Sequence, residues 1–494
     1  MANAEVESLI ARNPATGAEI GRIAATPPDA VAALVDRARA ASSAWADRPI
    51  VERIEVVRRW WKILAGEAES LAAVIRDEIG KPLPEAQMEV TGALDAIRWT
   101  VKKARSALAD SRIAPGWQRM ALMGAARLRW RPLGVVGIVG TWNYPVFLDA
   151  PAIAQALVAG NAVAWKPSES AILVADRLCE TLGRCGLPPG LVAPLFGGPA
   201  IGQALIASDL DKAFFTGGTV TGRLVAAGLA TRGIPAVAEL SGFDPAIVLP
   251  DAPLDSTARA LTWAAFIGAG QTCVAVKRVY VVGDAGPLAA DLARRAGALR
   301  VGDPGGGAVD MGPMISVAAR ARVHETILRA IAAGATVLHG AEPIAGLGAF
   351  YRPTVLLARD DAPERVLQGI FGPVVVVRGV EDDDEAVAAA NGTGFGLAAS
   401  VWGRERARAR AVAARLRAGT VSINDAVTPT GLASAPFGGT KMSGFGRVRG
   451  VLGLREFASP QVAHQRGPGG FRPHLFPYSD RLGTIFASYR RLFH

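Results

Sequence analysis

Apolar side chains recur at helical spacing through the first hundred residues. Val31, Leu34, Val35 and Ala38 lie three or four positions apart, as on the buried face of an amphipathic helix. The preceding Thr26-Pro27-Pro28-Asp29 has the composition of a helix start, with a capping hydroxyl, prolines and an acid. The pattern predicts helical stretches from this start, from Ile50 to Ile79, and from Leu83 to about Leu108.

From residue 135 the pattern changes to short apolar runs that alternate with helical segments. The runs predict buried strands at Val135–Val139, Ala162–Trp165, Leu191–Leu195 and Ala213–Phe215. Helices are predicted at Pro151–Val158, at Ser170–Leu182 and from Thr219 toward Leu229. This alternation is typical of parallel βαβ units with helices on both faces of the sheet. Ligands of such sheets bind at the carboxyl ends of the strands, where Asn143, Lys166 and Gly217 fall.

The second half of the chain repeats this alternation. Strands are predicted at Ala246–Leu249, Val279–Val282, Thr336–His339, Val374–Arg378 and Thr420–Asn424. Helices are predicted at Ser256–Ile267, Gly286–Leu299, Val317–Ala333 and Glu385–Asn391. Because 494 residues exceed one compact core, we expect two or three domains, with a boundary near Ser241-Gly242.

Two further segments differ from this pattern. Gln118–Leu122 and Ala126–Trp130 alternate polar and apolar residues around Gly124, which predicts a hairpin. Near the C-terminus, Arg481–Phe493 places its large apolar residues on one helical stripe beside arginines. We expect this helix to dock on the body of the chain, and contact with a membrane surface is the alternative.

The formal charge of +10 is carried mainly by arginine. The arginines are dispersed, without a basic stripe interleaved with aromatic residues, so a nucleic-acid partner is not expected. The first twelve residues contain Glu5 and Glu7 and no apolar core, unlike a signal peptide. Three cysteines cannot form a disulfide framework, and we therefore expect a reducing, cytoplasmic location.

One of the cysteines stands at a junction where helical spacing gives way to a valine-rich run. The stretch is Gly268-Ala269-Gly270-Gln271-Thr272-Cys273-Val274-Ala275. Cys273 is either a small buried hydrophobe, as most lone cysteines are, or a nucleophile exposed by backbone that glycine permits. Cys179 lies on a helical stripe and Cys185 in a turn, and both are interpreted as structural.

Five other stretches decide between the two readings of Cys273. They are Thr141-Trp142-Asn143-Tyr144-Pro145, Trp165-Lys166-Pro167-Ser168-Glu169, Phe215-Thr216-Gly217-Gly218-Thr219, Glu239-Leu240-Ser241-Gly242 and Pro436-Phe437-Gly438-Gly439. Together with Gly270-Gln271-Thr272-Cys273 they resemble the aldehyde dehydrogenase superfamily in order and spacing. The resemblance runs from Asn13-Pro14-Ala15-Thr16-Gly17 to Gly444-Phe445-Gly446-Arg447 and so covers most of the chain.

The resemblance implies an α/β fold with four parts. They are a Rossmann-like dinucleotide-binding domain (1–112 and 132–241), a catalytic α/β domain (242–443), a β-hairpin oligomerisation arm (113–131 and 455–468) and a tail (469–494). In this arrangement Val462–Gln465 belongs to a late strand of the arm. A homodimer or tetramer is expected, with a ribbon confined to one subunit as the alternative.

The resemblance also implies the chemistry. Cys273 matches the nucleophile that attacks an aldehyde, and Asn143, with the backbone N–H of Cys273, matches the donors to the oxyanion. Hydride then leaves to the nicotinamide, and Glu239 matches the base that activates water to hydrolyse the thioester. The five histidines are scattered and no metal site is predicted. The expected function is NAD(P)-dependent oxidation of an aldehyde to a carboxylic acid.

No GxGxxG motif follows the first strand of the alternating region, so a standard Rossmann phosphate loop is not expected. The family resemblance places the cofactor instead against Trp142, Lys166, Ser168, Glu169, Gly217, Gly218, Gly222, Leu240 and Phe371. A carboxylate at Glu169 accepts hydrogen bonds from ribose hydroxyls and repels a 2′-phosphate. NAD is therefore favoured, with NADP as the alternative.

Four positions depart from the family pattern. Gly369 stands where a glutamate usually holds the nicotinamide ribose, and Gly268 replaces an asparagine. Ser241 replaces a glycine, and Phe243-Asp244 stands where lysine and a small residue are common. These changes motivate an alternative, a nucleotide-binding or assembly protein with little dehydrogenase activity. A second alternative is thioester transfer to coenzyme A, against which Glu239 argues.

The substrate is a separate question. Trp142, Tyr144, Trp263 and Phe266 are candidates for an apolar tunnel, and each could equally belong to the core. The C-terminal tail and the sequence motif around Asn143 favour fatty or aromatic aldehydes as substrates.

Overall fold

The computed structural model describes residues 7–113, 125–346, 348–466, 475–478 and 480–493. The N-terminal part consists of a hairpin followed by four helices. These are β1 (Ser8–Arg12), β2 (Glu19–Ala24), α1 (Ala30–Ala46), α2 (Ile50–Gly66), α3 (Ala68–Ile79) and α4 (Leu83–Ala107). The single helix predicted over 50–79 is wrong, because the helix is broken at Glu67. Thr26 does not cap α1 either, since its hydroxyl accepts the N–H of Phe196 at 3.0 Å.

The first large sheet has six strands in the order β17-β9-β8-β5-β6-β7. Its members are β5 (Val135–Val139), β6 (Ala162–Lys166), β7 (Val192–Pro194), β8 (Lys212–Thr216), β9 (Ala236–Glu239) and β17 (Gly444–Phe445). All neighbours are parallel except β17, which runs antiparallel to β9. The predicted strands are confirmed, and β9 was not predicted.

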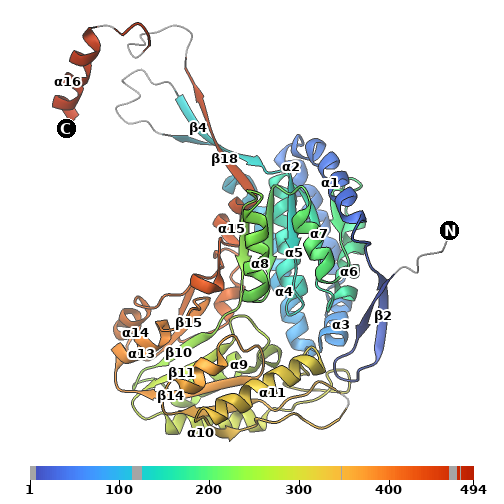
Figure 1. Ribbon diagram of the computed structural model, residues 1–494, viewed down its shortest axis with the longest axis vertical. Coiled ribbons are helices and arrows are strands. Elements are labelled where there is room, and N and C mark those ends of the chain that lie inside the picture. Colours follow the sequence, from blue (N-terminus) through green and yellow to red (C-terminus); the bar gives the residue numbers. More distant parts are fainter. Residues whose placement is uncertain (1–6, 114–124, 347, 467–474, 479, 494) are drawn as a thin grey trace.

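Helices lie on both faces of this sheet (Figure 1). They include α5 (Pro145–Ala159), α6 (Ile172–Gly183), α7 (Pro199–Ala207) and α8 (Thr219–Ala230). The helix predicted to start at Pro151 starts at Pro145 instead, with Pro151 inside it. Pro145 occupies the first turn, where a missing N–H costs nothing. The start at Pro145 brings Asn143 directly in front of the helix.

The second large sheet has seven strands in the order β12-β13-β14-β11-β10-β15-β16. They are β10 (Asp244–Val248), β11 (Val276–Val282), β12 (Thr336–His339), β13 (Thr354–Ala358), β14 (Val374–Val380), β15 (Ala398–Trp402) and β16 (Thr420–Ile423). Its helices are α9 (Leu254–Phe266), α10 (Gly286–Ala298), α11 (Val317–Ala332), α12 (Ala362–Leu367), α13 (Asp383–Asn391) and α14 (Arg406–Ala413). The sheet forms the lower lobe in Figure 1.

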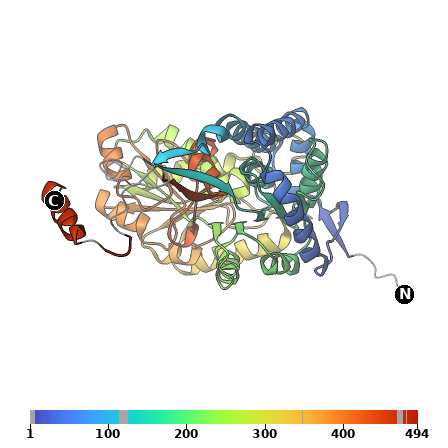
Figure 2. The same ribbon diagram turned by 90° about the horizontal axis from the view of Figure 1, so that it is seen from above.

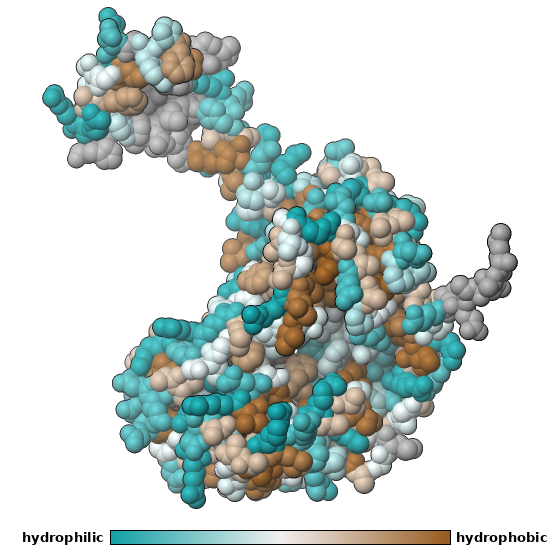
Figure 3. All heavy atoms as spheres, in the orientation of Figure 1, coloured by the Kyte–Doolittle hydropathy of each residue, from teal (hydrophilic) through white to brown (hydrophobic). Residues whose placement is uncertain are grey.

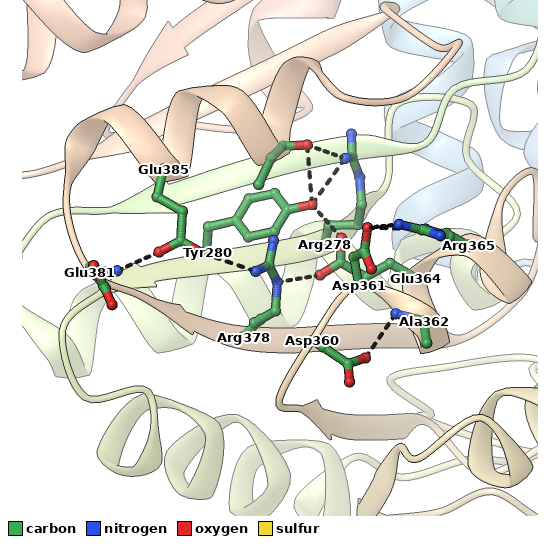
Figure 4. Close-up of polar contacts among 11 residues, drawn as sticks. Arg278, Tyr280, Asp360, Asp361, Ala362, Glu364, Arg365, Arg378, Glu381 and Glu385 are labelled. Carbon is green, nitrogen blue, oxygen red and sulfur yellow. Dashed lines mark hydrogen bonds and ion pairs between the residues drawn. The ribbon is translucent and has the colours of Figure 1, made fainter.

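A buried polar network ties this second sheet together (Figure 4). The Tyr280 hydroxyl donates to Glu364 at 2.5 Å, and Arg378 donates to the other oxygen of Glu364 at 2.9 Å. Arg278 donates to the Tyr280 hydroxyl at 3.0 Å and to the carbonyl of Phe243 at 2.9 Å. The network therefore joins β11, β14 and α12 to the segment that follows β9.

A three-stranded sheet projects from the body, in the order β18-β4-β3 (Figures 1 and 2). Its strands are β3 (Ser111–Ile113), β4 (Ala125–Pro132) and β18 (Ala458–Gln465). The pairing of β18 with β4 confirms that Val462–Gln465 belongs to a late strand of this sheet. The predicted strand Gln118–Leu122 lies outside the described residues.

After α15 (Gly450–Glu456) and β18, the chain ends in α16 (Arg481–Phe493). The predicted helix is confirmed, but its expected docking on the body is wrong, because α16 stands away from both lobes (Figures 1 and 2). Ile485 is 37% exposed, Phe486 52% and Leu492 75%. Among the described residues no helix is long and apolar enough to cross a membrane.

Candidate active site

The strand order of the first sheet reverses direction at β5, whose neighbours are β6 and β8. Open parallel sheets bind their ligands in the crevice at such a switch point. Trp142 and Asn143 follow β5, Gly217 and Gly218 follow β8, and Glu239 ends β9. All five residues line one cavity of about 290 Å³, together with Cys273 from the second lobe. The structure thus brings the predicted nucleophile, oxyanion donor and base together.

Cys273 follows an unusual turn. After α9 the chain makes a short 3₁₀ turn, Ile267–Gly270, in which Gly268, Ala269 and Gly270 have φ values of 62°, 53° and 68°. Left-handed backbone costs an alanine roughly 1–2 kcal/mol. A Cβ at Gly270 would lie 2.2 Å from the carbonyl oxygen of Gly372. Glycine at 270 is therefore required both by the backbone conformation and by the close approach of a second loop.

Side chains of the first lobe hold this turn. The Asn143 side-chain amide donates from Nδ2 to the carbonyl of Gln271 at 3.0 Å. The Thr141 hydroxyl donates to Asn143 Oδ1 at 2.8 Å, which orients the amide with its N–H groups toward the cysteine turn. The hydroxyls of Tyr144 and Thr272 lie 2.8 Å apart. The donor group predicted for the oxyanion is thus fixed next to Cys273.

Lys277 is a buried residue of this site that sequence reasoning missed. Its Nζ donates to the carbonyls of Gly270 at 2.8 Å and of Gly372 at 2.6 Å, and so joins the cysteine turn to the Phe371 loop. Burial lowers the pKa of Lys277 to about 7, against the opposing charge of Asp244. The available signal was a single lysine within the apolar run Val274 to Val282.

Glu239 is 6% exposed, and neither of its carboxylate oxygens has a hydrogen-bond partner among the described residues. Burial raises the pKa of Glu239 well above its usual range, and the positive charges of Arg449 and then Arg447 oppose that rise. A carboxyl group whose pKa is raised binds a proton more tightly than an ordinary carboxylate, which favours proton acceptance by a general base.

Without cofactor or substrate, the surroundings of Cys273 do not favour its thiolate form. Burial, followed by the negative charges of Asp244 and Glu239, raises its pKa to about 12, and Arg449 opposes the rise. Cys273 is therefore a thiol at neutral pH. Attack on a carbonyl requires that its proton leave, and the carboxylate of Glu239 lines the same cavity.

The residues predicted to hold a dinucleotide lie in two places. Trp142, Gly217, Gly218, Leu240 and Phe371 line the Cys273 cavity, and the rings of Trp142 and Phe371 meet edge to face with centroids 5.5 Å apart. The others lie around the same crevice: Lys166 ends β6, Ser168 and Glu169 follow it, and Gly222 lies in α8. Lys166 Nζ donates to Glu169 at 3.0 Å.

The start of α8 has the form of a phosphate cradle. Gly218 precedes the first turn, and a Cβ at Gly222 would lie 2.1 Å from a methyl group of Leu240. Bare backbone N–H groups at a helix start suit a pyrophosphate. Ser241 is one of the departures from the family pattern. Its hydroxyl oxygen accepts a hydrogen bond from the N–H of Thr219 at 3.3 Å. Its side chain therefore supports this turn.

Gly369 lines the cavity with a φ of 77°. Gly268, another position that departs from the family pattern, has a φ of 62°. This backbone conformation disfavours any residue with a side chain. Both glycines therefore belong to left-handed turns in this chain, and a longer L-residue at either position would be strained.

Cys273 also faces a second cavity of about 180 Å³. Apolar side chains form most of its wall, namely Met88, Phe147, Leu148, Trp263, Ile267, Val274, Val427 and Phe437. Of the four aromatic candidates for a tunnel, Tyr144 and Trp263 line this cavity. Trp142 lines the first cavity instead, and Phe266 is a core residue at 3% exposure.

Comparison with known proteins agrees with this geometry. The model of the aldehyde dehydrogenase family matches residues 1–462. A putative NADP⁺ succinate-semialdehyde dehydrogenase of Mycobacterium tuberculosis is 36% identical over 463 residues, which cover 92% of this chain and 87% of the relative. A betaine aldehyde dehydrogenase of Cereibacter sphaeroides is 39% identical over 449 residues, covering 90% of this chain and 91% of the relative.

Solved structures show the same fold. An aldehyde dehydrogenase of Mycobacterium tuberculosis complexed with NAD⁺ superposes with a TM-score of 0.89 at 30% identity, covering 95% of this chain and 96% of the other. A mutant aldehyde dehydrogenase of Pseudomonas syringae, complexed with NAD⁺ and octanal, has a TM-score of 0.88 at 32% identity, with the same coverage.

The chain belongs to the aldehyde dehydrogenase family. It is an oxidoreductase that acts on aldehydes with NAD(P).

Gly270→Ala tests whether the left-handed turn positions Cys273. Gly233→Ala is its control, because Gly233 has a φ of 69° and open space around its Cβ position. We expect Gly233→Ala to lose roughly 1 kcal/mol of stability with unchanged alkylation of Cys273. Gly270→Ala should lower alkylation and turnover by roughly 100-fold, because a misplaced nucleophile loses its alignment. Equal effects of the two variants would contradict the positioning role.

Proposed function

We propose that this chain oxidises apolar aldehydes, long-chain or aromatic, to carboxylic acids with NAD as the preferred cofactor. The observation that carries the proposal is the position of Cys273 between two cavities. The cavity on one side holds the residues suited to a nicotinamide. The cavity on the other side is walled mostly by apolar side chains, and Glu85, Glu89 and Arg449 also line it. An aldehyde entering from the apolar side meets the thiol before it meets the cofactor.

In the proposed reaction the Cys273 sulfur bonds to the carbonyl carbon, and the thiol proton passes to Glu239. The resulting oxyanion is stabilised by the Asn143 amide and the backbone N–H of Cys273. A nicotinamide held in the first cavity would supply the acceptor for the hydride that leaves the same carbon. Trp142 and Phe371 line the cavity on that side and exclude water from the transfer step.

Hydride transfer leaves a thioester on Cys273. Glu239 first releases the thiol proton to solvent and then removes a proton from water, whose oxygen attacks the thioester carbon. The carbon–sulfur bond breaks, the carboxylic acid leaves, and the proton on Glu239 returns to the Cys273 sulfur. Burial of Glu239 supports this role, because it raises the pKa of the carboxyl group and so makes the carboxylate a stronger proton acceptor.

Glu239→Gln tests both proton transfers. We expect the burst of NADH to form more slowly than in the wild type, because glutamine cannot accept the thiol proton. Steady turnover should fall by roughly 100-fold or more, since general-base catalysis contributes about that factor. The measurement is rapid-mixing absorbance of NADH with an aromatic and a long-chain aldehyde. Cys273→Ala is the control and should show neither burst nor turnover. Full turnover by Cys273→Ala would contradict the thioester route.

The NAD preference rests on Glu169. Its carboxylate pairs with Lys166 at 3.0 Å but remains 48% exposed, whereas Lys166 is 7% exposed. An exposed carboxylate can accept hydrogen bonds from a ribose and repel a 2′-phosphate. On the same side of the sheet Val220 and Leu224 of α8 are 78% and 69% exposed, and Figure 3 shows apolar side chains over this helix. These two side chains offer an apolar surface to the adenine ring.

Glu169→Gln should narrow the preference for NAD. We expect the ratio of kcat/KM with NAD to kcat/KM with NADP to fall about 10-fold, the equivalent of about 1.4 kcal/mol, because the repulsion of the 2′-phosphate is removed. Glu180→Gln, which removes an exposed carboxylate from α6, is the control. A wild-type enzyme that prefers NADP, or an unchanged ratio in Glu169→Gln, would contradict the role of Glu169.

The projecting sheet supports a homo-oligomer, either a dimer or a tetramer. β18 is an edge strand of that sheet, and Val462 on it is 61% exposed. Exposed edges of this kind pair readily with another chain. We expect sedimentation velocity of the wild-type protein to show a dimer or a larger oligomer. Val462→Asp should shift the distribution of species toward the monomer. Val51→Asp, at an exposed valine of α2, should leave it unchanged. A wild-type monomer would contradict this assignment.

A further inference from the structure

A buried arginine lies between Glu239 and the apolar cavity and has no role in the reaction described so far. β17 pairs with β9 so that Gly444 lies opposite Glu239. The chain then turns back along the sheet, and Val448 bridges to Phe437 through two backbone hydrogen bonds of 2.8 Å. The next residue, Arg449, has a φ of 62° and directly precedes α15. The strained conformation indicates that the surrounding structure holds this side chain in place.

The Arg449 guanidinium is sandwiched between aromatic rings. It lies 4.6 Å from the centroid of Phe147 and 4.8 Å from that of Phe437. One terminal nitrogen donates to the carbonyl of Thr430. The side chain is 4% exposed, and its Nε has no hydrogen-bond partner among the described residues. A charge buried in this way is costly unless an anion compensates it.

Two acidic groups of the active site lie within electrostatic range of Arg449. Burial lowers the pKa of Arg449 to about 10, and the charges of Glu239 and then Cys273 oppose that fall. The positive charge of Arg449 opposes the rise in the pKa of Glu239 more than that of Arg447 does, and it also opposes the rise in the pKa of Cys273. The side chains of Glu239 and Arg449 form no direct ion pair, so the compensation acts across space.

A small cavity, whose wall is mostly apolar but includes several polar groups, reaches both side chains. Glu239 and Arg449 both line a chamber of about 30 Å³, which also receives Asp149 and Gln155 from α5. A site of this volume can hold a water molecule, because roughly 10–15 Å³ is enough when polar partners are present. Both orphaned oxygens of Glu239 and the free edge of the guanidinium would find a partner in such a water.

We propose that Arg449 is a positioning residue for the reaction, whose buried guanidinium favours the charged forms of Glu239 and Cys273 and binds a water molecule that links it to Glu239. The proposal rests on the proposed function of Glu239 as base. It assigns a catalytic consequence to a side chain that, by its stacking between Phe147 and Phe437, would otherwise be counted as part of the apolar wall.

The charges that face Glu239 come from three segments. Arg447 and Arg449 follow β17, Asp149 projects from α5, and the Cys273 thiol comes from the left-handed turn. Burial raises the pKa of Asp149 to about 8, so this group is neutral near pH 7 and does not cancel the arginines. Arg447 donates to the carbonyls of Gly439 and Gly446 at 3.0 and 2.6 Å and is the weaker of the two cations at Glu239.

The direction of the expected pH effect follows from these charges. Glu239 accepts protons only when ionised, so activity falls on the acid side of its pKa. Loss of the Arg449 charge raises that pKa further and moves the acid limb of the rate profile to higher pH. The same loss makes the Cys273 thiolate harder to form, so alkylation at a given pH becomes slower.

The test compares Arg449→Met with Arg449→Lys. We expect Arg449→Met to move the acid limb of the steady-state rate upward by about one pH unit, and to slow iodoacetamide alkylation of Cys273 at pH 8 about 10-fold. Arg449→Lys keeps the charge and should restore most of both values. Alkylation is followed by mass spectrometry of the Cys273 peptide, without aldehyde or cofactor. Arg449→Gln is measured in parallel, in case Arg449→Met does not fold.

Two other arginines serve as controls. Arg447→Met should produce the same shifts with smaller size. Arg455→Met removes a guanidinium that stacks on Trp130 at 4.7 Å, outside all of these cavities, and should change neither profile. Unchanged pH and alkylation profiles in folded Arg449→Met would overturn the proposal. If no variant or wild-type protein turns over any aldehyde, the proposed function fails, whereas the alkylation profile still decides the role of Arg449.

Discussion

The left-handed turn from Gly268 to Gly270 is the constraint on which the site depends. It reverses the chain between α9 and β11 and presents Cys273 to the carboxyl ends of the first sheet, although the cysteine belongs to the second lobe. The turn is held from both sides, by Asn143 through the carbonyl of Gln271 and by Lys277 through the carbonyl of Gly270. Strain in this backbone is therefore balanced by contacts that also align the reacting groups.

Burial sets the chemistry of the site once the turn is in place. Glu239 is buried and Cys273 is partly buried beside one cavity, and burial disfavours the charged form of each. A single proton can therefore move between the two groups with little change in net charge inside the cavity. The nearby guanidinium of Arg449 limits the penalty, and the raised pKa of Asp149 keeps a second carboxyl group from adding to it.

The residues that depart from the family pattern differ from it in backbone conformation as well as in the side-chain contacts that they lack. Gly369 adopts a φ of 77°, so the peptide at this position turns in a way that a glutamate would strain. Phe243 packs against the Arg278 guanidinium at 4.8 Å, and the network of Figure 4 extends to its carbonyl. Ser241 supports the start of α8. The loops around the cofactor cavity are thus held by other interactions in this chain.

Much of the fold could be predicted from the sequence, because strands and helices of an α/β protein differ in the period of their apolar residues. The strands at Val135 and Ala162 and the helices at Leu83 and Val317 were predicted close to their observed bounds. Local patterns failed where a partner far along the chain decides the outcome. Thr26 bonds to Phe196 instead of capping α1, and α16 keeps its helical stripe without docking on the body.

The resemblance of the motifs to the aldehyde dehydrogenase family also predicted a nucleophile, an oxyanion donor and a base, namely Cys273, Asn143 and Glu239. Only the tertiary structure showed that they line one cavity, that Lys277 bonds to the cysteine turn, and that Arg449 lines a chamber with Glu239. In the sequence, Lys277 is a lysine within a valine-rich run and Arg449 is an arginine without a distinctive motif. They are two of the 54 basic residues. Their importance comes from burial and from neighbours on other segments, which the packing of the two lobes alone decides.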